Sequence, residues 1–131
     1  MRKKVLFVCV ENSNRSQMAE AFAKIHGKGI IDAYSSGSRP SGVVNPKAIA
    51  AMKELGYDLT KHDSKSLDEI PQIKYDYAIT MGCGDECPFI IAAHRDDWKL
   101  DDPKDLAPEA FNNVRNEIER RVKELIEKIA S

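Results

Sequence analysis

An uninterrupted apolar run near the N-terminus, VLFVCV at residues 5–10, constrains the fold of this chain most strongly. The run is rich in β-branched residues and does not alternate with polar ones, which is typical of a strand buried on both faces. Directly after it the apolar residues recur at three- and four-residue spacing, which predicts a helix over residues 16–26. A fully buried strand followed at once by a helix indicates an α/β protein with a parallel sheet.

The same alternation continues along the chain. Further strands are predicted over residues 29–37, 75–82 and 98–101, and further helices over residues 45–56, within 63–71, and from about 109 to the end. Asn45 followed by Pro46 is a favourable helix start. Parallel strands need right-handed crossovers, so the simplest arrangement is a single doubly wound domain over residues 1–131, whose four-stranded sheet has the order 2-1-3-4 and is flanked by helices.

Composition and charge narrow the class of protein. A chain of 131 residues with 42% apolar content can build one core without cross-links. The 20 basic and 21 acidic residues nearly cancel, so neither nucleic acid nor a membrane surface is an expected partner. The first apolar run ends at Glu11, too early for a signal peptide, and the three cysteines cannot all pair within the chain. We therefore expect the protein in the reducing cytoplasm. We also expect it to be a monomer.

The polar turn after the first strand is the predicted functional site. Ligands of doubly wound sheets bind at the carboxyl end of the strand where the winding reverses, and Cys9 stands at that end of the first strand. A turn leading into a helix N-terminus can point its backbone N–H groups inward as an oxyanion nest, which also favours the Cys9 thiolate. Arg15 can hold two oxyanion oxygens with its planar guanidinium. The predicted oxyanion-binding residues are Val10, Glu11, Asn12, Ser13, Asn14, Arg15 and Ser16.

Several side chains of this turn have individual predicted roles. Ser13 or Ser16 can donate a hydrogen bond to the Cys9 sulfur, and Asn12 can hold the shape of the turn. The Glu11 carboxylate would oppose both an anion and a thiolate, so we expect it to face solvent or to pair with a base. A cysteine in an apolar strand is usually a core residue, but its position at a strand end before a polar turn and a helix favours a nucleophile.

The pattern Cys-x5-Arg-Ser in CVENSNRS, followed by QMAEAF, resembles the low-molecular-weight protein tyrosine phosphatase fold, and specifically its arsenate reductase branch of the thioredoxin-coupled type. The stretches YSSGS, NPKAIAAMKELGYDL, TMGCGDECP, DWKLDDP and VRNEIERRVKELIEKI are similar to segments of the same branch. The resemblance implies that Cys9 attacks arsenate, that Asp102 protonates the departing oxygen, and that Cys83 attacks Cys9 to release arsenite. Cys87 then takes over the disulfide, which thioredoxin or a low-molecular-weight thiol reduces, with no bound cofactor.

Alternatives remain at this point. Only three residues separate Cys83 from Cys87, fewer than is typical of thioredoxin-coupled members, and other members use a low-molecular-weight thiol. Asp102 precedes Pro103 as the family's acid does, and Asp101 is the fallback. Phosphatases of this fold usually carry aromatic residues after this Asp-Pro pair, whereas Lys104 and Asp105 follow here, which favours a small inorganic oxyanion. A phosphatase acting through a Cys9 phosphoenzyme and a non-catalytic oxyanion-binding module are the two other candidate functions.

No metal site is predicted. Cys83 and Cys87 with His94 lack a fourth zinc ligand. Some arsenate reductases of the resembling family bind potassium beside the loop, and the matching positions here are Asn12, Glu20 and Ser35. Lys65 falls where an acidic ligand is expected, so its ammonium group can replace the ion. The three histidines, His26, His62 and His94, are predicted as surface or packing residues.

Overall fold

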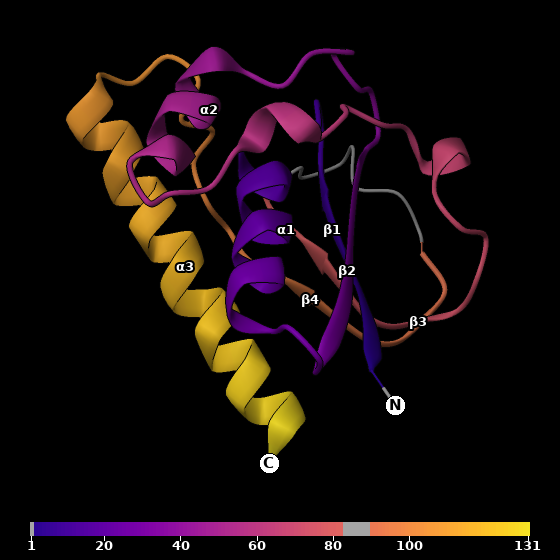
Figure 1. Ribbon diagram of the computed structural model, residues 1–131. Coiled ribbons are helices and arrows are strands. Elements are labelled where there is room, and N and C mark those ends of the chain that lie inside the picture. The colour runs from indigo at the N-terminus through magenta and orange to yellow at the C-terminus, as the bar shows by residue number, and fades with distance from the viewer. Residues whose placement is uncertain (1, 83–89) are drawn as a thin grey trace.

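The computed structural model describes residues 2–82 and 90–131. Figure 1 shows a sheet with helices packed against it. The elements follow the order β1 (Lys3–Cys9), α1 (Arg15–His26), β2 (Ile31–Gly37), α2 (Pro46–Lys53), the 3-10 turns η1 (Leu59–Lys61) and η2 (Leu67–Glu69), β3 (Tyr75–Thr80), β4 (Ala92–Asp97) and α3 (Pro108–Ala130). The four strands are parallel and lie in the order β2-β1-β3-β4, so the predicted α/β fold and strand order are confirmed.

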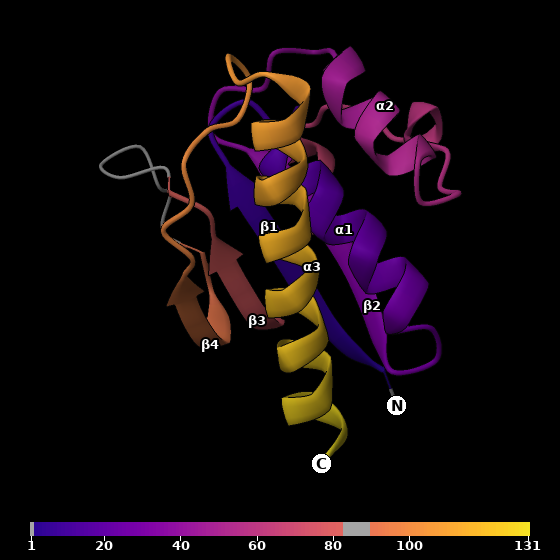
Figure 2. The ribbon, with the colours of Figure 1, turned by 90° about the vertical axis from the view of Figure 1, so that its left-hand side faces the viewer.

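The central strand β1 is buried on both faces. Val5 and Phe7 pack into the cluster that includes α1 and α3, whereas Leu6 and Val8 pack into a second cluster on the opposite face. Because successive residues of a strand point to opposite faces, both sets must be apolar, which accounts for the uninterrupted run. Helices α1 and α3 run side by side over the first face (Figure 2).

The winding of the chain reverses at β1. The connection from β1 to β2 passes through α1 on one face. The connection from β2 to β3 first runs through α2 and η1, which pack on that same face, and then through η2, which packs on the other face. The carboxyl end of β1, where Cys9 lies, is therefore the point at which the connections separate.

The fourth strand and the short third helix differ from the prediction. The strand is Ala92–Asp97, and the predicted strand at residues 98–101 was wrong. β4 is an edge strand whose residues beyond Ala92 are exposed, so it has no apolar run to mark it. Trp98 is buried and its N–H donates to the Thr80 carbonyl at 2.7 Å, after which the chain leaves the sheet. The helix predicted within residues 63–71 is only η2, and α2 ends at Lys53 instead of near residue 56.

The C-terminal helix α3 confirms the predicted spacing of apolar residues. Its inner side buries Phe111, Ile118, Val122, Leu125 and Ile126. Its outer side carries ion pairs, such as Arg120 with Glu117 and Glu124, which mark it as solvated. Neither α3 nor any other helix within residues 2–82 and 90–131 combines the length and the apolar character needed to cross a membrane.

Candidate active site

The turn between β1 and α1, residues 10–14, is held from outside by the segment that follows β2. The carbonyl oxygens of Cys9, Val10, Glu11 and Ser13 accept hydrogen bonds from the backbone N–H groups of Ser38, Arg39, Ser41 and Asn45 respectively, over 2.8–3.1 Å. A trans peptide unit carries its N–H opposite to its C=O, so the N–H groups of the following residues point away from that segment. This is the arrangement that an oxyanion nest requires.

Cys9 ends β1 with a buried side chain. Its Sγ lies 2.9 Å from the Oγ of Ser16 in the first turn of α1. The Ser16 Oγ accepts a hydrogen bond from Asn12 Nδ2 at 2.7 Å, which leaves the Ser16 hydroxyl hydrogen to point at the sulfur. Of the two serines predicted as donors, Ser16 is the one in contact with Cys9.

Asn12 is the residue on which the shape of the turn depends. It adopts a left-handed backbone with φ of 51°, which asparagine tolerates better than most residues. Its Oδ1 accepts hydrogen bonds from the Lys65 N–H at 2.8 Å and from Gln17 Nε2 at 2.9 Å. With Nδ2 bound to Ser16, the whole amide of Asn12 is engaged, so the turn is locked to both α1 and the segment before η2.

Gln17 and His62 form a buried support beneath the turn that the sequence did not predict. Gln17 Nε2 also donates to the carbonyls of Asn12 and Asp63, so its Oε1 is left to accept from His62 Nδ1 at 2.9 Å. His62 Nε2 then accepts from the Tyr57 hydroxyl at 2.6 Å. Burial lowers the pKa of His62, which keeps the ring neutral and suited to this one-donor, one-acceptor role. A glutamine in a first helical turn carries no sequence signal for such a role.

Arg15 joins the turn to the segments that follow β3 and β4. Its Nη1 donates to the carbonyls of Met81 at 2.6 Å and Leu100 at 2.8 Å, and its Nη2 lies 3.9 Å from Asp102 Oδ2. The guanidinium is buried, so these contacts fix its position. A Cβ on Gly82 would lie 2.8 Å from Arg15 Nη1 and 2.6 Å from the Leu100 carbonyl, and the φ of +78° also requires glycine there.

Asp102 and Lys104 lie on the loop after β4 and face the same turn. Asp102 Oδ1 accepts a hydrogen bond from the Lys104 N–H at 3.1 Å. Lys104 Nζ donates to Glu11 Oε2 at 3.1 Å, so the predicted pairing of Glu11 with a base is confirmed. That hydrogen bond and the charges of Glu11 and Asp102 raise the pKa of Lys104. Of the two acids offered by the sequence, Asp102 is the one with a carboxylate oxygen 3.9 Å from Arg15 Nη2, and its role as the proton donor stays a prediction.

Comparison with known proteins assigns the family. The family model for low molecular weight phosphotyrosine protein phosphatase matches residues 4–131. The chain belongs to this family. The glutaredoxin arsenate reductase of Synechocystis sp. is 42% identical over 131 residues, covering 98% of this chain and 99% of the relative.

Solved structures point to the same branch of the low molecular weight phosphatase family. An arsenate reductase in the phosphate binding state superimposes with a TM-score of 0.88 at 42% identity, over 97% of this chain and 98% of the other. An arsenate reductase in the oxidized state superimposes with a TM-score of 0.87 at the same identity and coverage.

Two lysine side chains of the protein lie at Glu20, one of the positions that the sequence matches to a potassium site. The buried carboxylate of Glu20 accepts from Ser35 Oγ at 2.5 Å and from Lys24 Nζ at 2.6 Å, and Lys65 Nζ lies 3.9 Å away. Burial alone would raise the pKa of Glu20, but these two hydrogen bonds and the charge of Lys65 outweigh it and lower the pKa. With two ammonium groups at one carboxylate, the residues present do not fit a further cation. Across residues 2–82 and 90–131, no three His, Cys, Asp or Glu side chains group as metal ligands.

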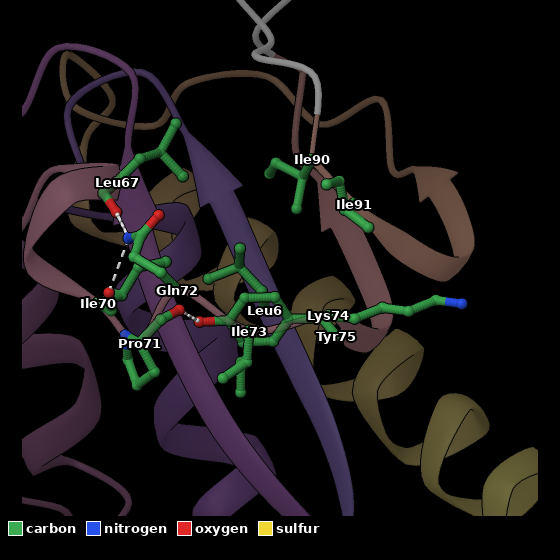
Figure 3. Close-up of a pocket in the computed structure, with 10 residues that line it drawn as sticks. All are labelled: Leu6, Leu67, Ile70, Pro71, Gln72, Ile73, Lys74, Tyr75, Ile90 and Ile91. Atoms are coloured by element: carbon green, nitrogen blue, oxygen red, sulfur yellow. Dashed lines mark hydrogen bonds between the residues drawn. The ribbon is translucent and has the colours of Figure 1, made fainter.

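The apolar hollow in Figure 3 lies away from the oxyanion turn, on the sheet face opposite α3. Its volume is about 470 Å³, and it is lined mainly by apolar residues, among them Leu6, Ile70, Ile73, Ile90 and Ile91. Gln72 closes one side by donating to the carbonyls of Leu67 and Ile70. Another cavity, of about 320 Å³, is lined by Gly82, Asp97, Lys99, Leu100 and Asp101. Two of these residues, Gly82 and Leu100, lie against Arg15.

The remaining two predicted site residues, Cys83 and Cys87, lie outside the described residues. The described chain stops at Gly82 and resumes at Ile90. Their predicted part in a thiol relay therefore stays a prediction.

Proposed function

We propose that this protein reduces arsenate to arsenite through a relay of three thiols, in one catalytic domain that spans residues 1–131. The Cys9 thiolate attacks arsenic while the nest and the Arg15 Nε and Nη2 groups hold the oxyanion. Asp102 donates a proton to the departing oxygen, which leaves as water. The product of this step is a covalent Cys9–arsenate adduct.

The second step transfers two electrons. The Cys83 thiolate attacks Cys9 Sγ, a disulfide forms between them, and the sulfur–arsenic bond breaks with its electron pair going to arsenic, which leaves as arsenite. Cys87 then attacks Cys83, which frees the Cys9 thiolate and moves the disulfide to the Cys83–Cys87 pair. An external dithiol or two equivalents of a low-molecular-weight thiol reduce that pair and complete the cycle.

The observation that carries this proposal is the position of the Arg15 guanidinium. It contacts the carbonyl of Met81 and lies near Asp102, and it belongs to the first residue of α1, directly after the turn that follows Cys9. The chain leads from Met81 into the segment of Cys83 within two residues, and Gly82 itself lies against Arg15. The oxyanion clamp thus contacts the end of the chain segment that precedes Cys83 and lies near the acid, and this supports attack and relay at a single centre.

Phosphate monoester hydrolysis is the second candidate, because it needs only Cys9, Arg15 and Asp102. Two observations favour arsenate. Lys104 and Asp105 follow Pro103, and Lys104 extends to Glu11, so no aromatic side chain lines a phosphotyrosine slot at these positions. The 42% identical relative carries the name of a glutaredoxin arsenate reductase. A non-catalytic oxyanion-binding module would need none of the three thiols.

The reductant is tested by comparing two coupled systems. NADPH consumption is followed on adding arsenate to the protein, either with thioredoxin and thioredoxin reductase or with glutathione, glutaredoxin and glutathione reductase. The resemblance predicts thioredoxin as the reductant, whereas the name of the 42% identical relative favours a glutathione-linked system, in which we expect the faster turnover. Both systems belong to a reducing cytoplasm, where we place the protein as a monomer.

Three single variants separate the candidate functions. Cys9→Ser is expected to abolish both arsenate reduction and hydrolysis of p-nitrophenyl phosphate. Cys83→Ser is expected to abolish arsenate reduction and to leave ester hydrolysis in place, and Cys87→Ser reports whether the relay uses the third thiol. Arsenate reduction that survives in Cys83→Ser would refute the relay, and ester hydrolysis without any arsenate reduction in the wild type would establish the phosphatase instead.

A further inference from the structure

An ion pair spans the solvent side of the site between two loops. Lys104 Nζ, from the loop after β4, lies 3.1 Å from Oε2 of Glu11 in the oxyanion turn. Both side chains are partly exposed, at 43% and 37%. An exposed pair of this kind adds little to folding stability, so we look for its effect in the Glu11 charge that it neutralises beside the site.

The backbone of Lys104 is held independently of this ion pair. Lys47, at the start of α2, donates from Nζ to the Lys104 carbonyl at 2.6 Å and to the Leu106 carbonyl at 3.3 Å. The Lys104 N–H donates to Asp102 Oδ1. These contacts are made by main-chain atoms of Lys104, so exchanging its side chain leaves them available.

The Glu11 carboxylate is the unfavourable charge of the oxyanion turn. It belongs to the same five residues whose N–H groups form the nest, and the anion to be bound carries up to two negative charges at neutral pH. Left unpaired, the Glu11 carboxylate would repel that anion, and salt would screen the repulsion only in part because Glu11 belongs to the turn itself. The Lys104 ammonium is the cation in direct contact with this carboxylate.

We propose that Lys104 is an affinity-determining residue, whose ammonium group cancels the Glu11 charge beside the nest and so permits a small dianionic oxyanion to bind. The inference rests on the proposed function, because it assumes that the nest takes arsenate or phosphate. Lys104 acts through Glu11 and does not need to touch the anion. The expected signature is a change in KM for arsenate and in the inhibition constant of phosphate, with a much smaller change in kcat.

A double-mutant cycle tests the charge argument. Lys104→Met retains the apolar stem and removes the charge, and we expect it to raise the KM for arsenate and the inhibition constant for phosphate by roughly three- to tenfold at low salt. Glu11→Gln is expected to lower both constants, because it leaves Lys104 unpaired. The double variant is expected to return close to the wild-type values. At an ionic strength of about 1 M, where the Debye length is about 3 Å, the effect of Lys104→Met should largely disappear.

Lys28→Met is the matched control, because it removes the same charge from an exposed position between α1 and β2, at the opposite end of the sheet. A raised KM in Lys104→Met that Glu11→Gln does not reverse, or that persists at high salt, would overturn the charge mechanism. So would equal shifts in the Lys28→Met control. A wild-type protein that binds no phosphate in isothermal titration calorimetry would contradict the proposed function itself, which distinguishes the two failures.

Discussion

Gly37 is the residue on which the geometry of the oxyanion turn can be tested most directly. It is the last residue of β2 and lies beside Cys9 on the neighbouring strand β1. A Cβ built on Gly37 would lie 2.5 Å from the Val10 carbonyl oxygen and 2.9 Å from the Asn12 nitrogen. Both are backbone atoms of the turn, so no flexible side chain can move aside, and the turn itself has to shift in a Gly37→Ala variant.

The size of the shift follows from these distances. Ordinary van der Waals contact begins near 3.4 Å, so the Val10 carbonyl must retreat by about 0.9 Å from a Cβ at 2.5 Å. A misplacement of about 1 Å in a positioned site can cost about 100-fold in rate. Forcing a methyl group into a packed site typically costs about 1–3 kcal/mol of stability. We therefore expect Gly37→Ala to fold, to lose about 1–3 kcal/mol, and to lose roughly 100-fold in kcat.

The assay pairs arsenate-dependent NADPH consumption with urea unfolding. Gly29→Ala serves as the control, because Gly29 has a φ of +82° and open space around its Cβ position. That substitution should cost about 1–2 kcal/mol of backbone strain while leaving the turn in place. A Gly37→Ala protein with wild-type kcat, or a Gly29→Ala protein that loses as much activity, would refute the reasoning.

Four further outcomes are expected. Ser16→Ala removes the hydroxyl at 2.9 Å from Cys9 Sγ, and we expect the alkylation rate of Cys9 at pH 7, followed on its peptide by mass spectrometry, to fall roughly tenfold; an unchanged rate would exclude this donor. The lowered pKa of His62 means that the unfolded chain binds a proton at a higher pH than the folded chain does, so the free energy of unfolding should fall as the pH drops below 6.5. In a His62→Gln variant the free energy of unfolding, measured with urea, should depend less on pH between pH 7 and 5. The lowered pKa of Glu20 should add a further loss below about pH 4.5 in both proteins. Replacing K⁺ by Na⁺ should leave the kcat/KM for arsenate unchanged in the wild type, whereas Lys65→Ala should make it sensitive to the ion; a wild-type enzyme that already responds to K⁺ would contradict the assignment of Lys65.

The parts of the fold predicted from sequence are those that local patterns mark. β1 is apolar throughout because both of its faces are buried, and α3 repeats apolar residues because one side packs on the sheet. Asn45 marks the start of α2 because its side chain accepts from the Lys47 N–H, a contact made within three residues. The edge strand β4 was placed six residues too late because most of its side chains are exposed, so burial imposes no pattern on it.

In the site, the sequence identifies groups but not their partners. The order of Cys9, the polar turn and Arg15 indicates an oxyanion loop, and the acidic Glu11 requires a counter-charge, because these are properties of neighbouring residues. The sequence could not predict that Lys104 supplies this counter-charge, because Lys104 lies 93 positions after Glu11 and only the folded chain brings the two together. Gln17 and His62 were missed for the same reason.

The sequence by itself determined the parallel α/β fold, the strand order and the turn at the end of β1, because burial, helix spacing and loop length act on residues close together in the chain. The tertiary structure alone decided which carbonyls clamp Arg15, which hydroxyl contacts Cys9 and which lysine faces Glu11. These contacts join segments through hydrogen bonds and ion pairs, whose strength depends on a few tenths of an ångström in distance and on direction. Such geometry exists only once the sheet has brought the ends of its strands together.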